Sequence, residues 1–237
     1  MGVERDGDAV LRPAAPWTAS VHALLAHVRE RGITWVPEPR GTRSGRPPGA
    51  ADRPAALAAV SWIEGEVPAY PMPEWVWAPA VLERAARMLR AYHDATAGFD
   101  RAGRTWALPA REPAEVICHN DFAPYNLAFR DGVPVGAIDF EAASPGPRAW
   151  DLAYLAYRLV PLADAANPDL PASPEAERAD RLATLCAAYG GIDPGAVLAL
   201  VPERLLALAR MSPPAHAELY RADAAYARAL GAARARG

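Results

Sequence analysis

A proline-rich segment separates two parts of the chain that have different hydrophobic patterns. Residues 67–79 read VPAYPMPEWVWAP and contain four prolines and three aromatic residues, which suits a packed linker rather than a regular element. Before this segment short apolar runs of strand length predominate, and after it apolar residues recur at helical spacing. We therefore expect an α+β fold, with a small sheet-bearing N-terminal lobe over residues 1–65 and a larger helical C-terminal lobe over residues 66–237.

The spacing of apolar residues predicts the individual elements. In the N-terminal lobe we expect strands over 8–12, 33–41 and 57–66, a helix over 21–32 and an exposed loop over 42–54. In the C-terminal lobe we expect helices over 79–97, 151–162, 174–190, 193–210 and 214–231. Between the first two of these helices, a strand leads into the loop at residues 116–121, and Asp131-Gly132 predicts a hairpin turn.

Composition excludes several classes of function. The chain has 237 residues and a net charge of −3, which indicates one compact body without the basic surface that nucleic-acid binding requires. No apolar run approaches the roughly 18 residues that a membrane span needs, so we expect no membrane partner. The N-terminal residues MGVERDGD lack the apolar region of a secretory signal, and we expect a cytoplasmic protein.

The basic residues and the cysteines narrow the chemistry further. The chain contains no lysine, so all 25 basic residues are arginines, which excludes a Walker A phosphate loop and Schiff-base catalysis. Cys118 and Cys186 are far apart in the sequence and show no CxxC spacing. Neither a disulfide scaffold nor a cysteine-based zinc site is therefore expected.

The most informative stretch is HNDFAPYN at residues 119–126, followed by IDFE at 138–141. A two-residue turn at 131–132 places Asn126 opposite Ala137, and hence on the same face as Asp139, about 7–8 Å away along the diagonal. One amide oxygen and one carboxylate at this spacing can bind Mg²⁺, which prefers oxygen ligands and completes its shell with water and phosphate. Asp121 lies just before the hairpin, where it can reach a substrate hydroxyl. The H-x-D-x-x-x-x-N spacing is typical of the catalytic loop of kinases.

These motifs resemble the aminoglycoside phosphotransferase/choline kinase family. HNDFAPYN and IDFEAASPGPRAWDLAY carry the resemblance, while LRAYHDAT and VSWIEGE resemble the family's pre-catalytic helix and inter-lobe hinge. The similarity extends over about residues 8–230, and its specific part is the block 117–157. It implies a protein-kinase-like two-lobe fold and a small-molecule kinase that uses ATP and Mg²⁺.

The resemblance also implies roles for individual residues. Asp121 is expected to be the catalytic base or the carboxylate that orients the substrate, with Asn126 and Asp139 as Mg²⁺ ligands. Ser61 and Ile63 would present backbone groups to adenine.

Three further residues have two interpretations each. Glu141 is either an additional metal contact or a solvated turn residue. His119 braces the catalytic loop or is a buried hydrogen-bonding histidine. Asp151 braces the same loop or caps the following helix.

The sequence departs from the family in the N-terminal lobe. Kinase-like folds hold the phosphates with a strand lysine paired to a helix glutamate, and here Arg12 is the only candidate for the cation and His22 stands where the glutamate is expected. An arginine fork differs from an ammonium in reach and shape. About ten residues precede Arg12, enough for one short strand, so we expect either a shortened N-terminal lobe or a start codon that is assigned too late.

Three functions fit these observations. The first is a kinase that transfers the γ-phosphate of ATP to the hydroxyl of a small-molecule acceptor, with Arg12 contacting the phosphates. The second is a catalytically weak or inactive nucleotide- or metabolite-binding protein, including an immunity-type protein. Metal-dependent hydrolysis is a third, disfavoured by the lack of a histidine pair or carboxylate cluster. Seven acidic and eight basic residues over 175–237 indicate no acidic pocket for a polycationic aminoglycoside.

Overall fold

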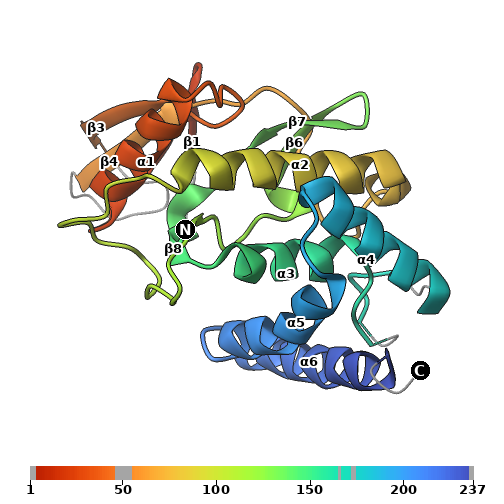
Figure 1. Ribbon diagram of the computed structural model, residues 1–237. Helices are drawn as coiled ribbons and strands as arrows, with labels where there is room; N and C mark the ends of the chain where they lie inside the picture. The colour runs from red at the N-terminus through yellow and green to blue at the C-terminus, as the bar shows by residue number, and fades with distance from the viewer. Residues whose placement is uncertain (1–3, 46–54, 165–166, 172–174, 235–237) are drawn as a thin grey trace.

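The structure is a computed structural model and describes residues 4–45, 55–164, 167–171 and 175–234. An antiparallel sheet with a helix beside it forms the N-terminal part, and helices form most of the remainder (Figure 1). This is the α+β composition expected from the change in hydrophobic pattern.

The N-terminal sheet has four strands in the order β1-β2-β4-β3, all paired antiparallel: β1 (Glu4–Asp6), β2 (Ala9–Pro13), β3 (Pro39–Gly45) and β4 (Ala55–Ser61). Helix α1 (Thr18–Glu30) follows β2 and buries an apolar stripe that includes Val21, Leu24 and Val28. Its i, i+3, i+7 spacing explains why this helix could be predicted.

The strand predicted over residues 33–41 is confirmed at 39–41 and wrong at 33–38. The chain is irregular from 33 to 38, and β3 begins only at Pro39. Pro37 and Pro39 lack a backbone N–H, which disfavours a strand at 33–38. The predicted exposed loop is also wrong at its start, because residues 42–45 belong to β3, and its remainder at 46–54 lies outside the described residues.

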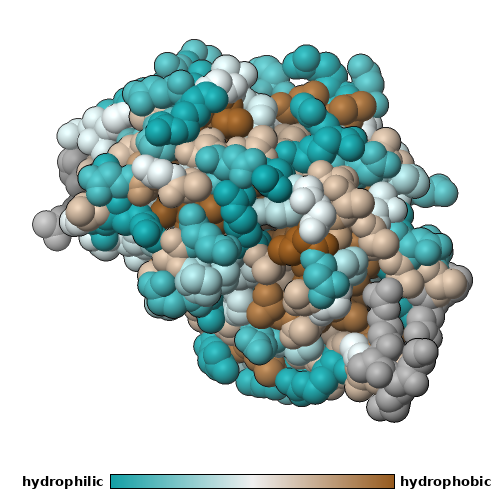
Figure 2. Space-filling view, in the orientation of Figure 1, coloured by the Kyte–Doolittle hydropathy of each residue, from teal (hydrophilic) through white to brown (hydrophobic). Residues whose placement is uncertain are grey.

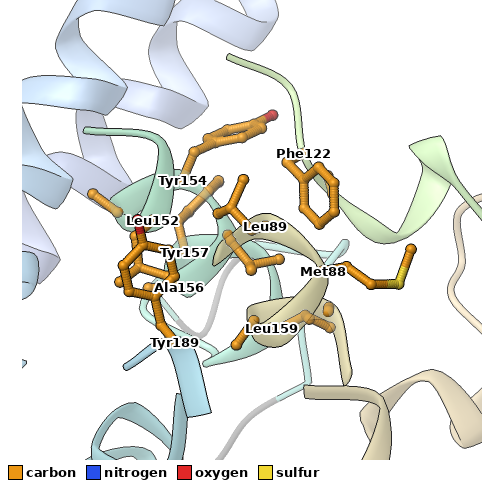
Figure 3. Close-up of a cluster of buried hydrophobic side chains, with 14 of the residues drawn as sticks. Met88, Leu89, Phe122, Leu152, Tyr154, Ala156, Tyr157, Leu159 and Tyr189 are labelled. Atoms are coloured by element: carbon orange, nitrogen blue, oxygen red, sulfur yellow. The ribbon is translucent and has the colours of Figure 1, made fainter. Parts of the chain in front are cut away.

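The C-terminal part contains the five predicted helices: α2 (Pro79–Thr96), α3 (Arg148–Leu159), α4 (Glu175–Tyr189), α5 (Pro194–Ala209) and α6 (Pro214–Arg234). Helices α2 and α3 enclose the main core, in which Leu89, Phe122 and Tyr157 are fully buried and their side chains converge (Figure 3). Helix α5 packs on α3 and α6, at the end of the molecule away from the sheet (Figure 1).

Two short pairs of strands lie between α2 and α3. Strand β5 (Val116–Cys118) pairs with β8 (Ser144–Gly146), and β6 (Leu127–Arg130) forms the predicted hairpin with β7 (Val133–Ala137). Short 3-10 turns, η2 (Pro124–Asn126) and η3 (Phe140–Ala142), flank this hairpin, and a third, η1 (Glu74–Trp77), lies before α2. The hairpin of β6 and β7 is therefore inserted in the sequence between β5 and β8, which pair with each other.

The hairpin register differs from the predicted one. Arg130 faces Val133 as predicted, but a bulge between Ala128 and Phe129 shifts the pairing, so Leu127 rather than Asn126 faces Ala137. The prediction that Asn126 shares a strand face with Asp139 depended on the unshifted register and is therefore wrong. Two features account for the bulge: Pro134 cannot donate to the ladder, and the Phe129 backbone exchanges hydrogen bonds with Glu66 of the preceding linker.

Hydrophilic residues predominate on the face shown in Figure 2, with apolar patches between them. Within the described ranges no single helix is long and apolar enough to cross a membrane, although Ala176–Tyr189 and Pro194–Ala209, bent by 102°, meet the criterion as a pair by length and composition.

A buried polar pair joins α2 to α3. His93 of α2 donates from Nε2 to Asp151 Oδ2 of α3 at 3.1 Å, and its Nδ1 accepts from the Tyr189 hydroxyl at 2.7 Å. His93 and Asp151 are fully buried. Burial lowers the pKa of His93, because the imidazolium form would lose its hydration.

This pair predicts how stability depends on pH. Because the folded pKa of His93 lies below its ordinary value of 6.5, its contribution is fully present above pH 6.5 and is lost as the pH falls. The slope approaches about 1.4 kcal/mol per pH unit for one such group. Urea unfolding at pH 7.5, 6.5 and 5.5 should therefore show that the free energy of unfolding falls less with decreasing pH in His93→Gln than in the unsubstituted protein. Burial also lowers the pKa of His22 and His27, but both proteins retain them, so the comparison isolates His93. An equal dependence of the unfolding free energy on pH in the two proteins would contradict the role given to His93.

Candidate active site

The loop that carries the H-x-D-x-x-x-x-N pattern is held from behind by one carboxylate. Asp151 accepts the backbone N–H of His119 at 2.7 Å and that of Asn120 at 2.8 Å. Burial by itself raises the pKa of Asp151, but the hydrogen bond from His93 and these backbone donors outweigh it and hold the pKa below its usual value. Pro147 is the N-cap residue of α3, so Asp151 does not cap the helix and instead fixes the loop.

His119 connects the loop to the end of the hairpin. Its Nε2 donates to the carbonyl of Ile138 at 3.0 Å, and its Nδ1 accepts the backbone N–H of Asp121 at 3.2 Å. The ring is fully buried. Both interpretations of this histidine therefore hold, since it is a satisfied buried side chain and it also braces the loop.

Asp121 and Asn126 are in direct contact. Asn126 Nδ2 donates to Asp121 Oδ2 at 2.8 Å and to the carbonyl of Asp121 at 2.9 Å, while the Tyr125 hydroxyl donates to Asp121 Oδ1 at 2.7 Å. Both hydrogens of the Asn126 amide are thus engaged, and its Oδ1 is the atom left to accept or to bind a cation. Burial raises the pKa of Tyr125, as do the neighbouring Tyr154 and Asp121, which keeps its hydroxyl protonated as a donor.

Asp139 follows β7 in a left-handed conformation, with φ of 61°. Its side chain is 49% exposed, and its Oδ1 accepts from Arg12 Nη1 at 2.8 Å. The same nitrogen lies 3.4 Å from Glu141 Oε1, and Glu141 Oε2 accepts from the indole N–H of Trp17 at 2.7 Å. Glu141 is therefore a partner of Arg12 and not a solvated turn residue.

Arg12 pairs differently from the strand lysine of kinase-like folds, whose partner is a helix glutamate of the N-terminal lobe. His22 of α1 lines the same cavity of about 20 Å³ as Arg12 and Asp139. Burial and the nearby Arg12 guanidinium lower the pKa of His22, so it is neutral at pH 7 and cannot replace a glutamate. Two carboxylates from the C-terminal part hold the cation instead, and they join the two parts of the molecule.

Ser61 and Ile63 lie where the N-terminal sheet ends. The Ser61 N–H donates to the carbonyl of Glu38 at 2.8 Å, and the Ser61 hydroxyl accepts the Glu38 N–H at 2.8 Å, so Ser61 can offer a ligand its carbonyl and its hydroxyl hydrogen. The Ile63 side chain packs against Gly136 of β7 so closely that a Cβ on residue 136 would clash with it. The sheet end and the hairpin thus meet at this point.

A buried arginine surrounded by tyrosines adjoins Asp121 and was not predicted. Arg158 of α3 is 5% exposed and donates to the hydroxyls of Tyr154 at 3.2 Å, Tyr70 at 3.1 Å and Tyr220 at 3.1 Å. The Tyr154 hydroxyl in turn lies 2.6 Å from that of Tyr125, which contacts Asp121. The sequence signal was an arginine four residues after a tyrosine on an apolar helix, which by itself indicates only core packing.

Sequence comparisons find two similarities. The family described as "Phosphotransferase enzyme family" matches residues 100–200, which include the braced loop, the hairpin and α3. The trifolitoxin immunity protein of Rhizobium leguminosarum bv. trifolii is 36% identical over 148 residues, or 60% of this chain and 52% of that protein. The match therefore spans about half the length of this curated relative.

Structural comparisons give the fold over nearly the whole chain. An amicoumacin kinase, solved with AMP-PNP, Ca²⁺ and its antibiotic, has a TM-score of 0.65 at 13% identity, covering 98% of this chain and 87% of that one. A putative aminoglycoside phosphotransferase from Ralstonia eutropha JMP134 has a TM-score of 0.60 at 13% identity, covering 98% and 92%.

The predicted protein-kinase-like α+β fold is thereby confirmed, and so is the resemblance that was based on residues 117–157: in sequence and in fold, the chain is similar to the aminoglycoside phosphotransferase/choline kinase family.

Proposed function

We propose that this chain is a small-molecule kinase that transfers the γ-phosphate of ATP to a hydroxyl group of a metabolite. The observation that carries the proposal is the contact between Asp121 and Asn126 on a loop that Asp151 fixes from behind. Phosphoryl transfer depends on positioning and on neutralising charge more than on covalent chemistry. A carboxylate whose two oxygens are both oriented by neighbouring donors suits that requirement. The phosphotransferase family match supports the same reaction class.

The nucleotide is proposed to bind between the N-terminal lobe, residues 1–65, and the C-terminal lobe, residues 66–237. The Ser61 carbonyl and the Ile63 backbone would contact adenine at the junction of the sheet and the hairpin. Arg12 would contact the phosphates. Its ion pair with Asp139 has to break before it can do so. Phosphate oxygens would then replace the carboxylate as the partner of the guanidinium.

Asn126 and Asp139 fit the requirements of a divalent cation. The Oδ1 of Asn126 is left available by its two Nδ2 contacts, and the Asp139 carboxylate is half-exposed. Both are hard oxygen donors of the kind that Mg²⁺ prefers. When bound, Mg²⁺ neutralises charge on the phosphates. The complex of the amicoumacin kinase with AMP-PNP and Ca²⁺ supports the use of a nucleotide and a divalent cation by this fold.

Asp121 is proposed to orient the acceptor hydroxyl and to receive its proton. Tyr125 and Asn126 each donate to one carboxylate oxygen, so the direction of the carboxylate is set before an acceptor arrives. The Arg158–tyrosine group next to Tyr125 places a buried positive charge on this side of the loop. A positive charge here disfavours a polycationic acceptor and favours a neutral or anionic one.

A second candidate function is a binding protein of the immunity type, which has the fold but little or no turnover. The 36% identity to the trifolitoxin immunity protein favours it. The ion pair between Arg12 and Asp139 is also compatible with it, since it engages one proposed metal ligand in the absence of nucleotide.

Substitution of Asp121 separates these two functions. For a kinase, Asp121→Asn should reduce kcat by roughly 10²–10⁴, the range for a positioned proton acceptor, with ATP affinity changed only a few-fold. The matched control is Asp131→Asn, which makes the same substitution at the exposed turn of the hairpin, where asparagine tolerates the φ of 51°. Release of ADP across a panel of hydroxylated metabolites measures turnover, and calorimetry measures ATP affinity.

The outcomes are distinct. Turnover in the unsubstituted protein and in Asp131→Asn, with loss in Asp121→Asn, supports the kinase. Turnover that Asp121→Asn leaves intact contradicts the assigned role. Ligand binding with no ADP release in any of the three proteins supports the binding protein.

Arg12 is expected to contact the phosphates of ATP and not the adenine. Arg12→Gln should weaken ATP binding by about tenfold, because a charge-assisted hydrogen bond is lost, while adenosine binding stays within about twofold. Calorimetry with both ligands in the presence of Mg²⁺ makes the comparison. An equal loss for the two ligands would show that Arg12 only supports the fold.

The acceptor class can be tested with matched compounds. ADP release is expected with neutral polyols or hydroxy acids, and not with a polycationic aminoglycoside at equal hydroxyl content. Efficient turnover of the aminoglycoside would contradict the charge argument that rests on Arg158.

A further inference from the structure

A pocket adjoins the catalytic loop at Asn120. Its volume is about 170 Å³, against about 30 Å³ for one water in the liquid, so it can hold a small ligand of several heavy atoms. The lining comes from the segment before β5, from the loop, and from α3 and α5. Three of the lining residues are arginines, namely Arg111, Arg204 and Arg210, and none is acidic.

Arg204 is the central residue of this pocket. It lies on α5, is 2% exposed, and donates from Nη2 to the carbonyl of Asn120. Its Nε is buried without a hydrogen-bond partner in the described part of the chain. The guanidinium also stacks near Trp150 and Tyr154, at 5.3 and 4.7 Å from the ring centroids. A buried guanidinium without a carboxylate partner is costly unless an anion neutralises its charge.

The charges in the pocket are not balanced by protein groups. Among the described residues, no carboxylate lies within 4.0 Å of the guanidinium of Arg111, Arg204 or Arg210. Burial lowers the pKa of Arg111, and the repulsion from Arg204 and Arg210 adds to this effect, while the exposed Glu203 and the buried Cys118, both outside the lining, oppose it.

Two features show that the pocket is built rather than incidental. The Arg111 guanidinium is held flat over the Trp150 ring at 3.7 Å, which fixes its position at the rim. Ser144 Oγ accepts from Asn120 Nδ2 at 2.9 Å, so its own O–H is left to donate to a ligand. The pocket therefore combines three cations with one additional neutral donor, the Ser144 hydroxyl.

We propose that this pocket binds a tetrahedral oxyanion of the phosphate class, held by Arg111, Arg204 and Arg210. Guanidinium forks bind phosphate oxygens in pairs, and a bound anion neutralises the clustered charge. The site is separate from the proposed nucleotide site, because it shares no lining residue with the cavity that contains Arg12 and Asp139.

The site is connected to the catalytic loop through one residue. Arg204 donates to the carbonyl of Asn120, which directly precedes Asp121. A bound anion would hold Arg204 in place, and would thereby stabilise the loop conformation that orients Asp121.

Calorimetry and thermal unfolding with sodium phosphate at constant ionic strength test the proposal. Phosphate at about ten times its Kd should raise Tm by about 3–6 °C in a saturable manner, with one site per chain. Arg111→Gln/Arg210→Gln should weaken binding about tenfold or more, since both residues lie at the rim and Arg204 keeps its contact with Asn120. The matched control is Arg221→Gln/Arg228→Gln, which removes the same charge from exposed positions on α6. Arg12→Gln should bind phosphate normally, because its site is a different one.

A phosphate monoester such as glycerol phosphate distinguishes the source of the anion. Binding of both compounds indicates the phosphoryl group of a metabolite, and binding of orthophosphate alone indicates the free ion; either result supports the site. The proposal is overturned if no saturable binding occurs, if the Arg111/Arg210 variant binds as tightly as the α6 control, if Arg12→Gln abolishes binding, or if acetate binds as well as phosphate.

Discussion

The buried carboxylate of Asp151 is the interaction on which the candidate site depends. It receives hydrogen bonds from His93 of α2 and from two consecutive backbone N–H groups of the loop after β5. Removal of this acceptor would leave several buried donors unsatisfied at once, and each costs about 1–3 kcal/mol. The position of Asp121 thus follows from the packing of α2 against α3, because the same contact that closes the core also fixes the loop.

The absence of lysine has a structural consequence at the junction of the two parts. Arg12 extends from the sheet to Asp139 and Glu141 of the C-terminal part, and not to a partner within its own part. A neutral His22 on α1 cannot take the role of that partner. The cation that is proposed to bind phosphate is therefore paired with a proposed metal ligand, so that nucleotide and carboxylate compete for one guanidinium. Because of this competition, the free energy of nucleotide binding includes the cost of breaking the ion pair between Arg12 and Asp139.

Much of this architecture could be predicted from the sequence, for physical reasons. Helices of the C-terminal part carry long periodic apolar stripes, and the spacing of Asp121 and Asn126 is local, so both features are visible without tertiary information. The hairpin register could not be predicted, because it depends on a bulge and on the docking of Phe129 against Glu66, 63 residues earlier in the chain. The same holds for Arg158 and Arg204, whose surroundings come from several helices. Arginine is common in this sequence, and only burial distinguishes these two from the exposed ones.

The central claim is that Asn126, Asp139 and Arg12 form a metal–nucleotide site in front of a fixed loop. A crystal structure with a non-hydrolysable ATP analogue and Mg²⁺ tests it most directly. The account predicts Mg²⁺ on Asn126 Oδ1 and the Asp139 carboxylate, Arg12 moved from Asp139 to a phosphate, and the Asp151 contacts to the loop unchanged. A nucleotide bound elsewhere, or bound here with the Arg12–Asp139 ion pair intact and no metal on Asn126, would contradict it.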